Sequence, residues 1–385
     1  MRILVFSPFY PPHKGGLESH SDEFNKYLSA QGTQVSVFTP RIPQDSPERE
    51  IRHDGVGIIR FPALELIHNY PLPKFWQKRF WQLWQELYTK PYDVVVSRTR
   101  FFFTSLMALR FAKKTALPLV HIEHGSDFTH FNNSFKTWLG MLYDRTCGAF
   151  VLRHSDRVIG NSEASARFVY QLSGRDCTVI YRGVEKEIIL ATAPNDSIKK
   201  LYPEKLIIGF VGRLIDGKGV YDLIDAFSLI QHNAVCFIIG NGPEKSRLER
   251  IAKERGVADR VVFFGEKSFT ETIALLKIFD IFVNPSYVEG IPTSVIEAAL
   301  CHKAIIATNV GGTREIITGT GDGFFVTPHD IPDLKNKLEH LLSDPSLRQS
   351  FSERAFLAVA KKFDWNHSAN QYLAVFSKLL ENKRG

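Results

Sequence analysis

The feature that most constrains this chain of 385 residues is a strand–helix alternation that occurs twice. In the second half, short apolar runs separated by amphipathic segments predict strands at 206–211, 235–239, 261–264, 281–284 and 304–307. The first half opens in the same way, with strands expected at 3–6 and 35–39. Strands that alternate with helices indicate parallel sheets covered on both faces. We therefore expect an α/β protein of two doubly wound, Rossmann-like domains facing each other across a cleft.

The expected boundary lies at the start of a polar stretch at 184–204, the expected linker, which contains Pro194, Asn195 and Pro203. It divides the chain into an N-terminal domain of residues 1–185 and a C-terminal domain of residues 186–364. Residues 365–385 are expected to form a closing helix.

Composition favours a globular protein, with 44% hydrophobic and 23% charged residues. No apolar run approaches the roughly 20 residues that a membrane-spanning helix needs. The N-terminus reaches Pro11-Pro12 too early for a secretory signal, and four scattered cysteines suit a reducing compartment. We expect a cytoplasmic protein.

Two glycine-rich turns between a strand and a helix could hold an anion. Gly15 and Gly16 precede the first expected helix, where free amides and the helix dipole favour a phosphate, although a plain tight turn explains them equally well. In the second half, Arg213 and Lys218 follow the strand at 206–211 on a glycine-rich loop. A guanidinium and an ammonium at the carboxyl end of a strand can clamp a diphosphate.

The segment at 284–297 carries the most specific pattern. Glu289 lies in a loop after a strand, and the amides of Gly290, Ile291 and Thr293 precede or begin a helix, where they would face an anion. Glu297 could accept hydrogen bonds from a ribose diol. The alternative is that both glutamates are ordinary exposed acids.

Three other features bear on the chemistry. His124 ends a predicted strand, directly before Gly125, and a lone histidine there is more often structural than catalytic. The chain has no D-x-D motif, so a metal held by paired aspartates is unsupported, and cations and helix amides would have to stabilise a diphosphate leaving group. The segment Gly240-Asn241-Gly242 lacks the third glycine of a dinucleotide fingerprint, which argues against an NAD enzyme.

In their order and spacing these motifs resemble the GT-B retaining glycosyltransferases of family 4 type. The likeness covers most of the chain. It includes the glycine turn at 15–18, His124-Gly125, Gly212-Arg213 with Lys218-Gly219, the E-x7-E element from Glu289 to Glu297, and the segments 310–315 and 323–326.

The resemblance implies that the C-terminal domain binds a UDP- or GDP-sugar. Arg213 and Lys218 would contact the diphosphate and Glu297 the ribose, with Glu289 and the amides of Gly290, Ile291 and Thr293 beside the sugar. Gly16 would complete the phosphate site and His124 would lie near the sugar hydroxyls. Transfer would be metal-independent, with no cofactor and with retention at the anomeric carbon. The closing helix would cross back onto the first domain.

One segment of the first half accounts for the net charge of +7. Residues 74–114 contain nine basic and two acidic residues, and the apolar positions at 76–87 fall on one helical stripe. Aromatic and basic residues on one helix suit an anionic membrane surface and therefore a lipid-linked or oligosaccharide acceptor, at the inner face of the membrane. The alternative is core packing with lysines reaching outward. The residues concerned are Lys74, Trp76, Lys78, Arg79, Phe80, Trp81, Trp84, Arg98 and Arg100.

Other functions stay open at this point. A nucleotide-sugar epimerase or hydrolase would need the diphosphate site but no acceptor. A non-catalytic scaffold would catalyse no reaction. Nucleic-acid binding would also use basic and aromatic residues, but the sequence contains no recognisable nucleic-acid module.

Overall fold

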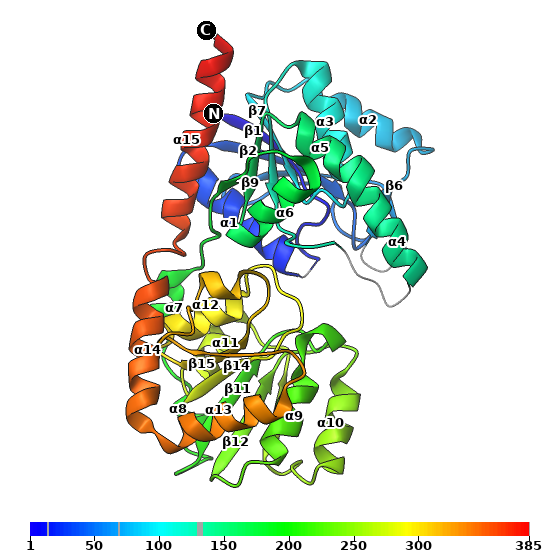
Figure 1. Ribbon diagram of the computed structural model, residues 1–385. Coiled ribbons are helices and arrows are strands. Elements are labelled where there is room, and N and C mark those ends of the chain that lie inside the picture. Colours follow the sequence, from blue (N-terminus) through cyan, green and yellow to red (C-terminus); the bar gives the residue numbers. More distant parts are fainter. Residues whose placement is uncertain (14, 68–69, 129–133, 385) are drawn as a thin grey trace. The chain divides into compact units, whose positions relative to one another are not determined.

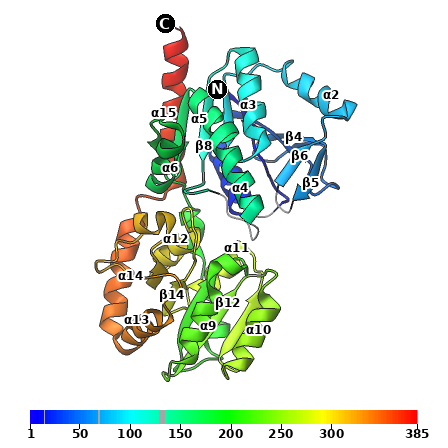
Figure 2. The same ribbon diagram turned by 45° about the vertical axis from the view of Figure 1, so that its right-hand side comes forward.

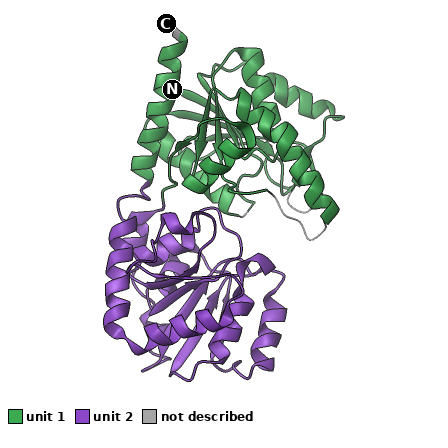
Figure 3. Ribbon diagram, viewed as in Figure 1, with its two compact units in different colours: residues 1–183, 365–385 green, residues 184–364 purple. Residues whose placement is uncertain are grey.

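The computed structural model describes residues 1–13, 15–67, 70–128 and 134–384. They divide into two compact units, coloured separately in Figure 3. The first comprises Met1–Gly183 and Trp365–Gly385, and the second Val184–Asp364. The division falls two residues before the expected boundary at 185/186, and the closing helix belongs to the first unit.

The first unit is built on an eight-stranded sheet with the order β10-β9-β8-β7-β1-β2-β4-β3. All neighbouring strands are parallel except β3, which runs antiparallel to β4. The strands are β1 (Arg2–Phe6), β2 (Gln34–Pro40), β3 (Arg49–Ile51), β4 (Gly57–Phe61), β7 (Val94–Arg98), β8 (Leu119–Glu123), β9 (Arg157–Gly160) and β10 (Thr178–Val179), and β5 (Ala63–Ile67) pairs with β6 (Tyr70–Pro73) in a separate hairpin.

Helices cover both faces of this sheet (Figures 1 and 2). On one face α1 and α15 pack over β1, where Phe24, Trp365 and Tyr372 lie in one buried cluster with Val5. The other face is covered by α2 and α3. The helical segments of this unit are α1 (Gly16–Ala30), α2 (Lys78–Leu87), α3 (Phe103–Thr115), α4 (Ser134–Tyr143), the π-helical turn η1 (Asp144–Gly148), α5 (Ala149–His154), α6 (Glu163–Ser173) and α15 (Trp365–Arg384).

The apolar stripe of α2 faces the core. Phe80 and Trp84 are buried in the same cluster as Phe6 and Phe111. Their assignment to a membrane or acceptor surface is therefore wrong, because the stripe covers the sheet. Trp76 and Trp81 are exposed.

The second unit contains a six-stranded, fully parallel sheet with the order β13-β12-β11-β14-β15-β16. In chain order this is 3-2-1-4-5-6, the doubly wound arrangement whose order reverses beside the first strand. The strands are β11 (Leu206–Val211), β12 (Ala234–Ile239), β13 (Val261–Gly265), β14 (Ile281–Asn284), β15 (Ala304–Thr308) and β16 (Phe324–Val326).

Helices cover both faces of the second sheet. They are α7 (Lys186–Ala191), α8 (Asp196–Lys199), α9 (Val220–Ser228), α10 (Lys245–Glu254), α11 (Phe269–Leu276), α12 (Thr293–Leu300), α13 (Ile331–Ser343) and α14 (Pro345–Val359), with 3-10 turns η2 (Asp216–Lys218) and η3 (Gly311–Glu315). The stretch expected as a linker at 184–204 contains α7 and α8. No helix in the described part of the chain is long and apolar enough to cross a membrane.

Candidate functional site

The candidate donor site of the second unit lies where the loops after β11 and β14 meet. These two strands are parallel neighbours at the point where the strand order reverses, so the loops at their carboxyl ends leave the sheet at the same edge, where ligands of such folds usually bind. Arg213 and Lys218 follow β11, and Glu289 follows β14. The fold therefore places these three residues of the predicted donor site at one edge of one sheet.

Lys218 and Glu289 form an ion pair between these two loops. Lys218 Nζ donates to Glu289 Oε1 at 2.6 Å, and both side chains are largely buried. Arg213 is exposed, and its guanidinium makes no ion pair with a described residue. A lysine held by a carboxylate and an unpaired arginine thus stand on the same loop.

Backbone contacts fix the relative positions of the two loops. Tyr287 donates its amide to the carbonyl of Gly217 at 2.9 Å. Gly219 has a φ of 63°, and a Cβ there would lie 2.0 Å from the carbonyl oxygen of Pro285. Only glycine allows this approach, which brings the start of α9 against the loop that carries Glu289.

The loop after β15 packs against the same segment. Gly311 has a φ of 53°, and a Cβ there would lie 1.8 Å from the carbonyl oxygen of Glu289. The amide of Gly312 donates to the carbonyl of Gly290 at 2.7 Å. The glycines of the motif at 310–315 thus pack directly against the backbone of the Glu289 loop.

The amides expected to face an anion lie at the start of α12. Those of Gly290 and Ile291 make no hydrogen bond to another described residue, and Thr293 is the first residue of the helix. Pro292 is the N-cap rather than the first helical residue, and its side chain supplies no capping hydrogen bond. This end of α12 is therefore available to a negatively charged group.

Glu297 lies one turn into α12 and is half-buried. Beside the same loops is a cluster that the sequence did not identify. The ring of Tyr287 lies 3.9 Å from that of His329, whose amide donates to Asp222 at 3.2 Å. Asp222 comes from α9 and His329 from beyond β16, so no sequence pattern links them.

In the first unit, His124 follows β8 and lies beside a second buried histidine. Its ring contacts that of His20 edge to face at 4.5 Å. Burial, together with the nearby Arg98, lowers the pKa of His124 to about 3. The Asn161 amide contacts Nδ1 at 3.4 Å, and the buried Nε2 has no partner among the described residues. With Asn161 donating to Nδ1, the neutral ring carries its proton on Nε2.

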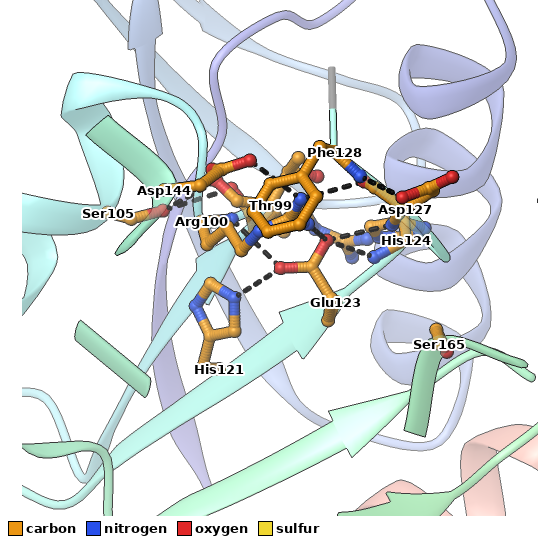
Figure 4. A network of polar contacts seen from close by, with 12 residues as sticks. Thr99, Arg100, Ser105, His121, Glu123, His124, Asp127, Phe128, Asp144 and Ser165 are labelled. Atoms are coloured by element: carbon orange, nitrogen blue, oxygen red, sulfur yellow. Dashed lines mark hydrogen bonds and ion pairs between the residues drawn. The ribbon is translucent and has the colours of Figure 1, made fainter. Parts of the chain in front are cut away.

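A buried network holds the loop that carries His124 (Figure 4). Glu123 accepts hydrogen bonds from the amides of His124 at 2.9 Å and Gly125 at 2.8 Å. It also pairs with Arg100 at 3.1 Å, and Arg100 pairs with Asp144 at 3.0 Å. Burial alone would raise the pKa of Glu123, but Arg100 and the other donors hold it well below its usual range.

Arg98 and Arg100 were expected on a membrane or acceptor surface, and that prediction is wrong. Arg100 is the central cation of the network around Glu123. Arg98 is fully buried, donates to His20 Nδ1 at 2.9 Å and stacks on Phe24 at 4.4 Å. Both follow or end β7, a central strand, so their side chains are enclosed by the unit.

The remaining basic residues predicted for that surface lie around α2. Arg79 pairs with Glu48, and Glu86 on α2 itself pairs with Arg49 and Lys90. Lys74 and Lys78 make no ion pair with a described residue. The positive charge of this region is thus partly compensated.

The glycine turn before α1 already contains a carboxylate. Gly15 is the N-cap of α1, and a Cβ there would lie 2.4 Å from Glu18 Oε2. Glu18 pairs with His13 in turn. Gly16 begins the helix, and a Cβ there would meet no atom within 4 Å. The phosphate-binding role of Gly15 and Gly16 stays a prediction.

Two family models match the chain. Residues 193–357 match the model described as "Glycosyl transferases group 1", and residues 14–188 match "Glycosyltransferase Family 4". The chain is also 33% identical to an uncharacterized glycosyltransferase of Methanocaldococcus jannaschii, over 99% of both chains.

A second relative has a named reaction. The chain is 24% identical, over 93% of its own length and 94% of the relative, to the N,N'-diacetylbacillosaminyl-diphospho-undecaprenol alpha-1,3-N-acetylgalactosaminyltransferase of Campylobacter jejuni.

Solved structures show the same fold. A sucrose-phosphate synthase from Thermosynechococcus elongatus superposes with a TM-score of 0.83 at 20% identity, over 99% of both chains. HepE of Anabaena in complex with UDP superposes with a TM-score of 0.78 at 20% identity, over 98% of this chain and all of that one. Each of the two units therefore corresponds to part of a known two-domain architecture.

Proposed function

This chain belongs to the group 1, family 4-type glycosyltransferases with the GT-B fold, and on that basis we propose that its second unit binds a UDP- or GDP-sugar. The observation that carries the proposal is the Lys218–Glu289 ion pair next to the open N-terminus of α12, with the exposed Arg213 on the same loop as Lys218. Two cationic side chains and free amides there suit a diphosphate. UDP is bound by a protein of similar fold, which supports the uridine donor.

In the proposed reaction a hexose or N-acetylhexosamine moves to an acceptor hydroxyl with retention of configuration. The bond from the anomeric carbon to the diphosphate oxygen breaks, and a bond from that carbon to the acceptor oxygen forms on the same face. The acceptor proton passes to the leaving diphosphate. Arg213, Lys218 and the α12 amides stabilise the negative charge that develops on the leaving diphosphate. These groups can thereby neutralise the charge that a metal ion neutralises in other transferases.

Glu289 and His124 are the proposed partners of the sugar. Glu289 holds the ammonium of Lys218 in place and would lie beside the sugar. We propose that the neutral His124 lies near the sugar hydroxyls when the donor is bound and that Glu297 accepts hydrogen bonds from the ribose.

The proposed acceptor is lipid-linked or a glycan, at the cytoplasmic face of a membrane. A relative that covers nearly the whole chain is named for an undecaprenyl-diphosphate-linked acceptor, which supports a lipid-linked one.

The test is thermal stabilisation and hydrolysis across a panel of UDP- and GDP-sugars, with and without EDTA. One nucleotide should raise the melting temperature, and EDTA should not reduce the rise. Lys218→Ala should weaken nucleotide binding at least about tenfold, because a charge-assisted contact to phosphate is worth about 1.5–3 kcal/mol.

Lys335→Ala is a matched control. Lys335 pairs with Glu339 at 2.6 Å, with exposure similar to that of Lys218, but on α13. It should leave nucleotide affinity unchanged. If no nucleotide stabilises the protein, or if both variants bind it equally, the donor site lies elsewhere.

A further inference from the structure

The first unit exposes a continuous apolar helix face that the proposed site does not use. On α4 the side chains of Phe135, Trp138, Leu139 and Leu142 are 65%, 56%, 43% and 45% exposed. Their spacing of i, i+3, i+4 and i+7 places them on one side of the helix. The rings of Phe135 and Trp138 stack on each other at 6.0 Å. A stripe that normally packs against a core is here directed to solvent.

Buried contacts hold this helix with its apolar face outward. The turn η1 continues α4 into α5, and Figure 1 shows the three as one long inclined helix. On the inner side Asp144 is fully buried and pairs with Arg100. Gly140 and Gly148 are buried on the same side. Phe150 of α5 extends the exposed apolar surface.

The helices that carry this face and the adjacent α3 are strongly basic. The segments Ser134–His154 and Phe103–Thr115 contain a single carboxylate, the buried Asp144. Lys113 Nζ lies 5.2 Å from the ring of Phe150, so positive charge borders the apolar side chains directly. The basic residues of these segments are Arg110, Lys113, Lys114, Lys136, Arg145 and Arg153.

We propose that this α4 face, defined by Phe135, Trp138, Leu139, Leu142 and Phe150, docks on an anionic phospholipid bilayer. Aromatic and aliphatic side chains enter the acyl boundary while the bordering lysines and arginines meet the phosphates. A second copy of the chain is a poorer partner, because it would bring two surfaces of the same charge together.

The proposal deepens the membrane part of the proposed function by assigning it to α4 in place of α2. The apolar stripe of α2 is core, and several of its basic neighbours are paired with Glu48 or Glu86. Docking through α4 would hold the first unit at the membrane, where a lipid-linked acceptor is found.

Vesicle co-sedimentation tests it. Wild-type protein should bind vesicles of phosphatidylglycerol and phosphatidylcholine, and bind phosphatidylcholine alone weakly. The double variant Phe135→Ser with Trp138→Ser should lose at least about tenfold in partitioning. Lys113→Glu and Arg145→Glu should each lose about fivefold or more, and salt should weaken wild-type binding.

Two exposed apolar residues outside the face are matched controls. Trp76, which precedes α2, is 71% exposed, and Leu357 lies on α14 of the second unit. Trp76→Ser and Leu357→Ser should partition as wild type does. With brominated lipids, Trp138→Phe should still bind but lose most of the fluorescence quenching, whereas Trp76→Phe should keep it.

Three results would overturn the proposal. They are no binding to anionic vesicles, a loss of binding in Trp76→Ser equal to that of the double variant, or a lipid-free dimer that the double variant dissociates. Nucleotide stabilisation, measured without vesicles, should be unchanged in every α4 variant. A failure of membrane docking is thereby distinguished from a failure of the donor site.

Discussion

At the scale of single residues, the buried ring of His124 determines a pH dependence. Its pKa falls from 6.5 in the unfolded chain to about 3, because burial and Arg98 both oppose a positive charge. As the pH falls below about 6.5, His124 becomes protonated in the unfolded chain but stays neutral in the folded protein. The contribution of His124 to the free energy of unfolding is therefore fully present above pH 6.5. It decreases by up to about 1.4 kcal/mol per pH unit as the pH falls toward 3.

Urea unfolding at a series of pH values checks this prediction. His124→Gln should flatten the decline between pH 6.5 and pH 3 relative to wild type, whereas His53→Gln, at an exposed position, should not. The comparison between variants is needed because other groups titrate in the same range. Burial lowers the pKa of His20 as well, and Glu123 has a lowered pKa, so both add losses of the same sign. An unchanged slope in His124→Gln would contradict the assignment.

At the scale of elements, the loop after β15 should control the donor site through its backbone. Gly311→Ala places a methyl group 1.8 Å from the carbonyl of Glu289 and must displace that loop. We expect nucleotide affinity to fall at least about tenfold, together with a loss of stability greater than the roughly 1–2 kcal/mol of a left-handed residue alone.

Gly256→Ala separates the two effects. Gly256 has a φ of 70°, like Gly311 in the left-handed region, but a Cβ there meets no atom within 4 Å. It should cost only the backbone strain and leave nucleotide affinity unchanged in a calorimetric titration. Equal affinity in both alanine variants would mean that η3 does not support the site.

The elements also show what the sequence could predict. Two strands have the predicted bounds, β11 and β14, because buried parallel strands are short apolar runs bounded by turn residues. The periodicity of the sequence predicted the apolar stripe of α2 but not whether that stripe packs against the protein core or against a membrane. The same i, i+3, i+4, i+7 spacing occurs in α2, where it packs on the sheet, and in α4, where it is exposed. Which stripe is covered depends on tertiary packing.

The site residues that directly follow strands could be predicted from the sequence. Those whose interaction partners are distant in the sequence could not. Arg213, Lys218 and Glu289 lie in loops whose strands a parallel sheet brings together. Arg100, by contrast, looked like a surface residue beside Phe101, because its carboxylate partners lie 23 and 44 residues further along the chain. The strands β3 to β6, at 49–73, were not predicted at all.

At the scale of the whole molecule, the chain leaves the first unit at Gly183 and returns to it at Trp365, so the last helix stabilises the unit that contains the N-terminus. Trp365 is buried beside His20 and donates its indole N–H to Glu23 at 2.8 Å. None of its cluster partners belongs to the core of the second unit. Trp365→Ala should therefore destabilise the first unit by about 3–5 kcal/mol and leave the second nearly unchanged.

The distribution of tryptophan makes this measurable in the intact protein. All five tryptophans lie in the first unit, at positions 76, 81, 84, 138 and 365. Fluorescence therefore follows the unfolding of that unit, while far-ultraviolet circular dichroism follows both. In Trp365→Ala the fluorescence midpoint should fall, and circular dichroism should resolve a second transition near the wild-type midpoint of the other unit. Phe351→Ala, in the core of the second unit, should shift that transition instead. If both probes shifted together in both variants, the two units would unfold as one cooperative body despite their separate cores.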